Sequence, residues 1–302
     1  MLPKFPEFKK IDIQDREAVE VYTSKYPPYS DFNFTSLWAW DTAGERMLSV
    51  LNDNLVVRFT DYSTMEPFLS FLGDNECEKT ALELLQYSKE NGLPSQLRLI
   101  PEISIKDIDP SVLRIEEDRD NFDYVYSVAD LTALKGANYE SIRRSINTFK
   151  RNNPVVHTET KNCMDASTQS DILSVIDMWE KNKIARRQEY EIAHELESIR
   201  KLCASSTDYN LYVIELFIDA KPKGFMIAEM LSGGYAMSHF IKADINIKGI
   251  FDFLFHENAS YLQTKNVTSL NFEQDLGLAG LRQNKMSYVP QFCLKKYVVS
   301  EV

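Results

Sequence analysis

Residues 211–265 read LYVIELFIDAKPKGFMIAEMLSGGYAMSHFIKADINIKGIFDFLFHENASYLQTK, and this stretch decides the fold. Apolar runs, glycine turns and one amphipathic segment predict these elements in order: strands over 211–217, 224–231 and 235–242, a polar loop over 243–248, a helix over 250–265 and a strand over 267–272. Such an order is typical of a mixed, mainly antiparallel sheet that is flanked by helices. The sequence therefore predicts the α/β (α+β) class.

The first half of the chain shows the same coarse order. Its expected elements are a hairpin around Asn52-Asp53, a helix over 76–91, a strand over 96–100, a short acidic helix over 105–113 and a strand over 124–129. In the second half, a short helix over 276–285 and a strand over 291–299 complete the match. The repeated order predicts two tandem α/β units, 1–134 and 135–302.

Composition and charge exclude several classes of protein. Of the 302 residues, 44% are apolar and 26% are charged, which is normal for a globular protein and excludes wholesale disorder. The net charge is −11, so nucleic acid or an anionic membrane would be repelled unless a local basic patch binds it. No apolar run is long enough to span a membrane, and the N-terminus lacks the apolar core of a signal peptide.

Cysteine and histidine usage gives no sign of a metal site. The four cysteines and four histidines are scattered, without a CxxC pair or the spacing of zinc ligands. We therefore expect a cytoplasmic protein with no metal and no tightly bound cofactor. The oligomeric state is left open.

Four segments resemble one family. The run GIFDFLF at 249–255 is similar to a signature of phosphatidylglycerol lysyltransferase C-terminal domains. Three further runs resemble their uncharacterised soluble relatives: SDFNFTSLW at 30–38, RRSINTF at 143–149 and NFEQDLGLAGLR at 271–282. All four occur in the expected order along nearly the whole chain.

The resemblance implies two tandem GNAT-type units, as in lysyltransferase domains and in Fem-type aminoacyltransferases. The lysyltransferases carry an Asp and an Arg three residues apart on the third strand of the second unit. The similarly placed residues here are His239 and Lys242, so the mechanism of the family cannot simply be transferred. The membrane-embedded half of the lysyltransferases has no counterpart in this sequence, so we do not expect lipid aminoacylation.

The loop ahead of residue 250 is where a GNAT enzyme holds the phosphates of an acyl carrier. Gly249 permits close backbone approach, and Lys242 and Lys248 carry suitable charge. The usual glycine signature is missing, so an ordinary strand-to-helix loop is the alternative. Asp252 fits the dipole of the following helix or, alternatively, a substrate ammonium group. We expect strands 211–217 and 235–242 to bracket an open groove beside Gly249.

Further polar residues could take part in chemistry. Glu273 and Asp275 follow a strand and could bind an amine or act as a base, or Asp275 could cap the helix over 276–285. Arg282 and Lys285 share a helical face and could contact a phosphate, or be surface charge. Tyr235 is a candidate general acid, and His239 is either catalytic or a hydrogen-bonded structural residue.

A basic helix is expected over 138–152, in an otherwise acidic chain. Its cations include Arg143 and Arg144, and a second predicted helix over 171–187 ends in Arg186-Arg187. The patch could steer tRNA or CoA toward the site, or it could be a solvated helix face.

Three functions are consistent with these features. The first is an acyl- or aminoacyltransferase that moves an aminoacyl group from aminoacyl-tRNA, or an acyl group from acyl-CoA, to an amine or hydroxyl. The second is a binding protein that keeps the GNAT fold without catalysis. The third is an RNA-associated protein that uses the basic helix, whose affinity would fall steeply with salt.

Overall fold

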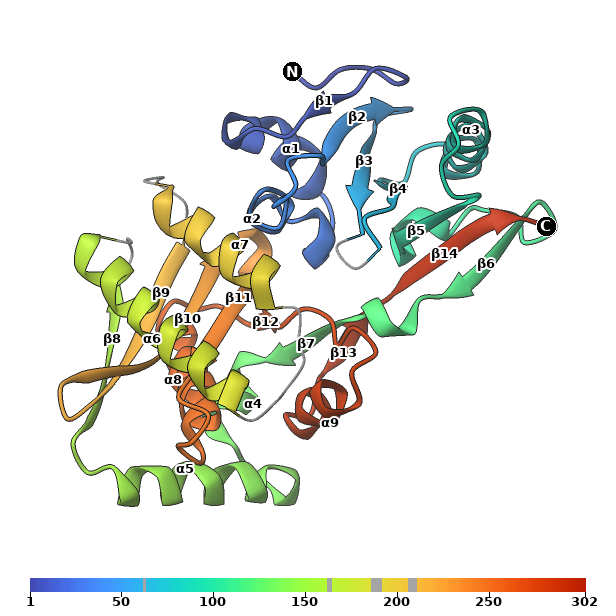
Figure 1. The fold of residues 1–302 in the computed structure, drawn as a ribbon. Coiled ribbons are helices and arrows are strands. Elements are labelled where there is room, and N and C mark those ends of the chain that lie inside the picture. The colour runs from blue at the N-terminus through green and yellow to red at the C-terminus, as the bar shows by residue number, and fades with distance from the viewer. Residues whose placement is uncertain (62–63, 162–164, 186–191, 206–210) are drawn as a thin grey trace. The chain divides into compact units, whose positions relative to one another are not determined.

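The structure is a computed structural model that describes residues 1–61, 64–161, 165–185, 192–205 and 211–302 (Figure 1). The chain forms two compact units. The first unit comprises Met1–Asp123, Gln274–Leu278 and Cys293–Val302. The second unit comprises Tyr124–Glu273 and Ala279–Phe292. The chain therefore crosses between the units at four points, after residues 123, 273, 278 and 292. A single cut at 134/135 does not coincide with these limits, and the tandem GNAT relationship of the two units stays a prediction.

The first unit contains two small antiparallel sheets. Its helices are α1 (Arg16–Thr23), α2 (Phe34–Ala39) and α3 (Cys77–Glu90). One sheet has the order β1-β2-β3-β4, formed by Lys9–Lys10, Met47–Leu51, Asn54–Thr60 and Pro67–Leu72. The other has the order β5-β14-β6, formed by Gln96–Pro101, Lys296–Glu301 and Leu113–Glu117. The predicted hairpin is confirmed, because Leu51 pairs with Asn54 around Asn52-Asp53, both in the left-handed conformation.

One expected element of the first unit is wrong. The acidic stretch predicted as a helix over 105–113 forms only a 3-10 turn at Glu102–Ile105, and the chain then enters β6. Strand β6 pairs with β14, which lies far away in the sequence. Local propensity therefore could not reveal it, because pairing with a distant strand stabilises it.

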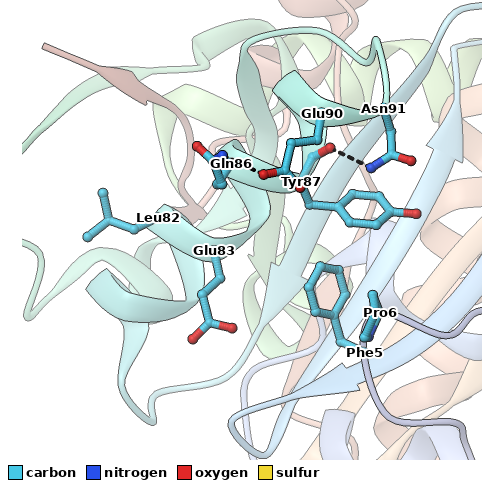
Figure 2. A pocket seen from close by; sticks show the side chains of 8 residues that line it. All are labelled: Phe5, Pro6, Leu82, Glu83, Gln86, Tyr87, Glu90 and Asn91. Carbon is cyan, nitrogen blue, oxygen red and sulfur yellow. Dashed lines mark hydrogen bonds between the residues drawn. The ribbon is translucent and has the colours of Figure 1, made fainter.

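A shallow groove lies on the surface of the first unit beside α3 (Figure 2). Its volume is about 550 Å³, and it is lined by Phe5, Pro6, Leu82, Glu83, Gln86, Tyr87, Glu90 and Asn91. The rings of Phe5 and Tyr87 meet edge to face at 5.0 Å. None of these eight residues belongs to the site predicted from the sequence.

The second unit is built on a larger mixed sheet, as predicted. Its helices are α4 (Val128–Ala133), α5 (Glu140–Asn152), α6 (Ala166–Ala185), α7 (Ile192–Ala204), α8 (Ile250–Thr264) and α9 (Ala279–Ser287). The sheet order is β13-β7-β12-β11-β10-β9-β8, formed by Phe292–Leu294, Asp123–Ser127, Ser269–Asn271, Tyr235–Ala243, Lys221–Met230, Leu211–Ile218 and Val156–Lys161. The pair β11–β12 is parallel, whereas the neighbours from β11 to β8 and the pair β12–β7 are antiparallel. The predicted α+β class is thereby confirmed.

The last strands of the two halves have changed places. Strand β7, which the sequence order assigns to the first half, pairs with β12 in the second unit. Strand β14, near the end of the chain, lies between β5 and β6 in the first unit. Each sheet therefore depends on a strand from the other half of the sequence.

Helices cover both faces of the sheet in the second unit. Helix α6 packs on β10 and β11 from one side (Figure 1). Helix α8 packs on the other side: Lys242 of β11 lies against Trp179 of α6, whereas a Cβ added at Gly224 would meet the next residue of β11, Ala243, together with Leu254 of α8. In the described ranges of the chain, no helix is long and apolar enough to cross a membrane.

Candidate functional site

A β-bulge in β11 brings two of the predicted residues to one face of the sheet. The register of β10 against β11 shifts between Ile227 and Ala228, and the residue that it skips on β11 is His239. In a regular strand, residues three apart point to opposite faces. The extra residue of a bulge cancels one step of this alternation. His239 and Lys242 therefore lie on the same face, the one covered by α6.

Strands β11 and β12 stop pairing just before this bulge. Their last register pair is Met237 with Asn271, whereas β11 continues to Ala243. The expected groove between 211–217 and 235–242 is wrong, because β10 lies between those two strands and pairs with both. The pairing of β11 with β12 therefore ends two residues before His239.

His239 is held between two carboxylates. Its Nε2 lies 3.3 Å from Oε2 of Glu229, and its Nδ1 lies 3.3 Å from Oε1 of Glu273. The His239 and Glu229 side chains are each 1% exposed, whereas that of Glu273 is 19% exposed. Burial lowers the pKa of His239, but the hydrogen bonds to Glu229 and Glu273 outweigh it and raise this pKa to about 9. At neutral pH the ring is an imidazolium that donates to both carboxylates.

Lys242 makes a second charged cluster on the same face. Its Nζ donates to Oε1 of Glu195 on α7 at 2.5 Å and lies 4.4 Å from the ring centre of Trp179 on α6. The Lys242 side chain is 9% exposed. Buried charges are costly unless they are paired, and they gather at functional sites. The α6 side of β11 is therefore the candidate site.

The charge of His239 should make stability depend on pH. Its pKa of about 9 in the folded protein exceeds the value of about 6.5 expected in the unfolded chain. The stabilisation is therefore complete below pH ~6.5 and is lost as the pH rises through 9, by on the order of 3 kcal/mol. Urea unfolding between pH 6 and 10 should show this fall in the wild type and not in His239→Gln. Parallel pH profiles for the two proteins would contradict it.

In the loop ahead of α8, several backbone groups form hydrogen bonds with other residues of the protein. Asp244 accepts hydrogen bonds from the backbone N–H of Asn246 and from the side chains of Asn182 and Lys223, while its backbone carbonyl accepts from Ile247. Lys248 is exposed. Several loop amides are thus used internally, and the loop needs no phosphate to hold its shape.

Close packing against α5 explains why a glycine occupies position 249. Its φ is +84°, and a Cβ there would lie 2.8 Å from the carbonyl oxygen of Ser145 and 3.1 Å from Cβ of Phe149. Both of these residues belong to α5. The glycine therefore lets α5 pack against the start of α8, in the place where a carrier phosphate was expected.

Asp252 stabilises the same contact between α5 and α8. It accepts hydrogen bonds from the hydroxyls of Ser145 and Tyr288. Burial and the charge of Asp252 raise the pKa of Tyr288 well above its usual value. The carboxylate thus joins α5, α8 and the end of α9, in addition to its favourable place in the first turn of α8.

The two arginines of α5 have different surroundings. Arg143 donates to the backbone carbonyls of Leu134 and Gly136, and these hydrogen bonds connect α5 to the segment that precedes it. Arg144 is exposed and pairs with Glu140 one turn earlier. The outer face of α5 is basic, with Arg144, Lys150 and Arg151 exposed. Arg186-Arg187 lie outside the described residues.

Two further predicted residues, Asp275 and Tyr235, have surroundings of their own. Asp275 belongs to the first unit, is fully buried, accepts from the backbone N–H of Gly277 and pairs with Arg119 at 3.3 Å. It does not cap α9, which begins at Ala279. Tyr235 starts β11, about 13 Å along the strand from His239 at four residues' distance.

The cations of α9 also differ from the prediction. Lys285 is buried rather than on a shared outer face, and its Nζ donates to the backbone carbonyl of Phe272. Arg282 is half-buried. A phosphate contact by this pair stays a prediction.

Sequence reasoning missed three residues of the site: Trp179, Glu195 and Glu229. Glu229 lies within the apolar run of β10, where a lone carboxylate at a buried strand position is a usable signal. Trp179 and Glu195 lie on separate helices, and only the fold brings them to Lys242. Among the described residues, no group of three or more His, Cys, Asp or Glu side chains could hold a metal ion.

The comparisons with known proteins agree with this architecture. The chain's family and its fold are those of an acyl- or aminoacyl-transferase-like domain. The phosphatidylglycerol lysyltransferase C-terminal family matches residues 23–300, and the chain belongs to that family.

Two solved structures show the shared fold. A conserved protein of unknown function from Bacteroides thetaiotaomicron has a TM-score of 0.84 at 23% identity, covering 100% of both chains. L-PGS from Bacillus licheniformis has a TM-score of 0.64 at 16% identity, covering 97% of this chain and 93% of its own. No curated protein matches the chain.

Proposed function

We propose that the second unit transfers an aminoacyl group from an aminoacyl ester, with aminoacyl-tRNA as the donor, to an amine or hydroxyl acceptor. The observation that carries this proposal is the hydrogen-bonded group Glu229–His239–Glu273 at the bulge of β11. A histidine and a carboxylate that are each 1% exposed, beside a second carboxylate that is 19% exposed, are unfavourable for stability alone, and such clusters are typical of reaction sites.

Glu273 is the base in this proposal. It is the most exposed member of the group, and its Oε1 lies 3.3 Å from Nδ1 of His239. Its carboxylate takes the proton of the acceptor, and the freed lone pair attacks the ester carbonyl. The bond from the carbonyl carbon to the ribose oxygen then breaks, and the proton passes from Glu273 to that oxygen. Lys242 stabilises the negative charge that develops on the carbonyl oxygen.

An aminoacyl ester is favoured over acyl-CoA as the donor. The start of α8, where a CoA phosphate was expected, packs against Ser145 through Gly249. The exposed cations of α5 fit the longer phosphate backbone of tRNA in an otherwise acidic chain. Acyl-CoA remains the second donor to test.

The experiment compares both donor classes. The protein is incubated with a pool of aminoacyl-tRNA or with acetyl-CoA, and ester loss, CoA release and the melting temperature are followed. We expect ester loss from aminoacyl-tRNA that Glu273→Gln lowers by about 100-fold, as for loss of a general base. Glu159→Gln, at a half-exposed residue of β8, should be unaffected.

Two results would contradict the proposal. One is the absence of both turnover and a melting shift with either donor. The other is donor binding without turnover that Glu273→Gln leaves unchanged, and this result would favour the binding protein that has lost catalysis. The replacement of the family's Asp and Arg by His239 and Lys242 keeps that second candidate open to test.

A further inference from the structure

The ion pair between Lys242 and Glu195 uses only one of the two carboxylate oxygens of Glu195. Oε1 of Glu195 accepts from Lys242, but Oε2 is buried and, within the described part of the chain, has no hydrogen-bond partner. An unsatisfied oxygen on a buried carboxylate costs about 1–3 kcal/mol. Native proteins rarely leave such an atom without a role, so Glu195 is suited to one further hydrogen-bond donor.

The position of Glu195 relates it to the proposed chemistry. Lys242 lies on the same face of β11 as His239, because of the bulge. Glu195 reaches that face from α7, and Trp179 reaches it from α6. A donor whose carbonyl oxygen lies at Lys242 would therefore place its neighbouring atoms beside Glu195 and Trp179.

The missing partner of Glu195 must carry N–H or O–H groups, because an ionised carboxylate only accepts. A positive charge would serve best, since charge-assisted hydrogen bonds are about twice as strong as neutral ones. In an aminoacyl ester, the α-ammonium group is one carbon from the carbonyl and meets both requirements.

Resting on the function proposed above, we propose that Glu195 and Trp179 form the subsite for the α-ammonium group of the donor. Oε2 of Glu195 accepts its hydrogen bond while Lys242 binds the carbonyl oxygen. The subsite thus selects aminoacyl donors with a free amino group over N-blocked aminoacyl donors and over simple acyl groups. Glu195 is a specificity residue here and takes no proton from the acceptor.

The test compares one pool of aminoacyl-tRNA with the same pool after acetylation of its α-amino groups. We expect the wild type to consume the free form at least about tenfold faster, as for one charge-assisted hydrogen bond. Glu195→Gln should reduce this preference to about twofold or less. Glu197→Gln, at an exposed residue two positions along α7, should keep the wild-type preference.

Equal rates for the free and acetylated pools in the wild type would overturn the subsite and leave the transferase standing. No turnover of either pool would instead count against the proposed function. The subsite is then decided by titrating the protein with phenylalaninamide and N-acetylphenylalaninamide while following tryptophan fluorescence, with Trp179→Phe as the control for the signal. Saturable binding of the free amide alone supports it; equal or absent binding of both overturns it.

Discussion

Deletion of residues 295–302 should prevent the first unit from folding. These residues contain β14, which is the middle strand of its three-stranded sheet, between β5 and β6. Val299 of this strand is fully buried in the core cluster of the first unit, together with Leu97, Ile100 and Leu113. The deletion removes two rows of backbone hydrogen bonds and exposes that cluster. We expect no cooperative unfolding transition for the first unit, and cleavage throughout residues 1–123 in limited proteolysis.

Deletion of Val302 alone is the control. Val302 is almost fully exposed and lies beyond β14, so the shortened chain should melt like the wild type. If the chain without residues 295–302 melted at the wild-type temperature, the central place of β14 in this sheet would be wrong.

Replacement of Lys296 by methionine should cost about 3–5 kcal/mol of stability, as for removal of one partner from a buried ion pair. Lys296 is fully buried; its Nζ lies 2.7 Å from Asp123 and also pairs with Asp31. Burial alone would lower the pKa of Lys296, but Asp123 and Asp31 raise it above its usual value. The methionine would leave both carboxylates without their cation.

The neighbouring lysine provides a matched control. Lys295 is 41% exposed and pairs with Glu117 at the surface. Surface pairs contribute only about 0–1 kcal/mol, so Lys295→Met should be close to neutral. Urea unfolding of the two variants measures the difference. A loss for Lys296→Met no larger than that for Lys295→Met would show that the buried charge is not required.

The elements from β9 to α8 were predictable because each carries its own local signal, whereas α4, β8 and α7 of the same unit were not predicted. The apolar runs of β9, β10 and β11, the glycines between them and the amphipathic pattern of α8 all lie within a short stretch. The exchange of β7 and β14 was not predictable in this way. Their sequences read as strands, but nothing local says which sheet receives them, because the choice depends on pairing between distant segments.

The site was predicted only in part, because its geometry also depends on pairing between strands. His239 and Lys242 were identified because they take the places of the family's Asp and Arg, yet regular alternation would have placed them on opposite faces. The bulge that joins them depends on the register of β10 and cannot be read from β11 alone. Gly249 was recognised as a close-approach residue, but the neighbour that requires it is α5, which lies about a hundred residues earlier in the chain.

The central place of β14 delays the folding of the first unit during translation. A ribosome releases the amino-terminal part of a nascent chain first, and such segments usually fold as they emerge. Strands β5 and β6 cannot both pair with β14 until residue 301 has left the exit tunnel, because β14 is translated after both of them. A stop codon ahead of β14 would therefore disable a part of the protein that is translated before this strand.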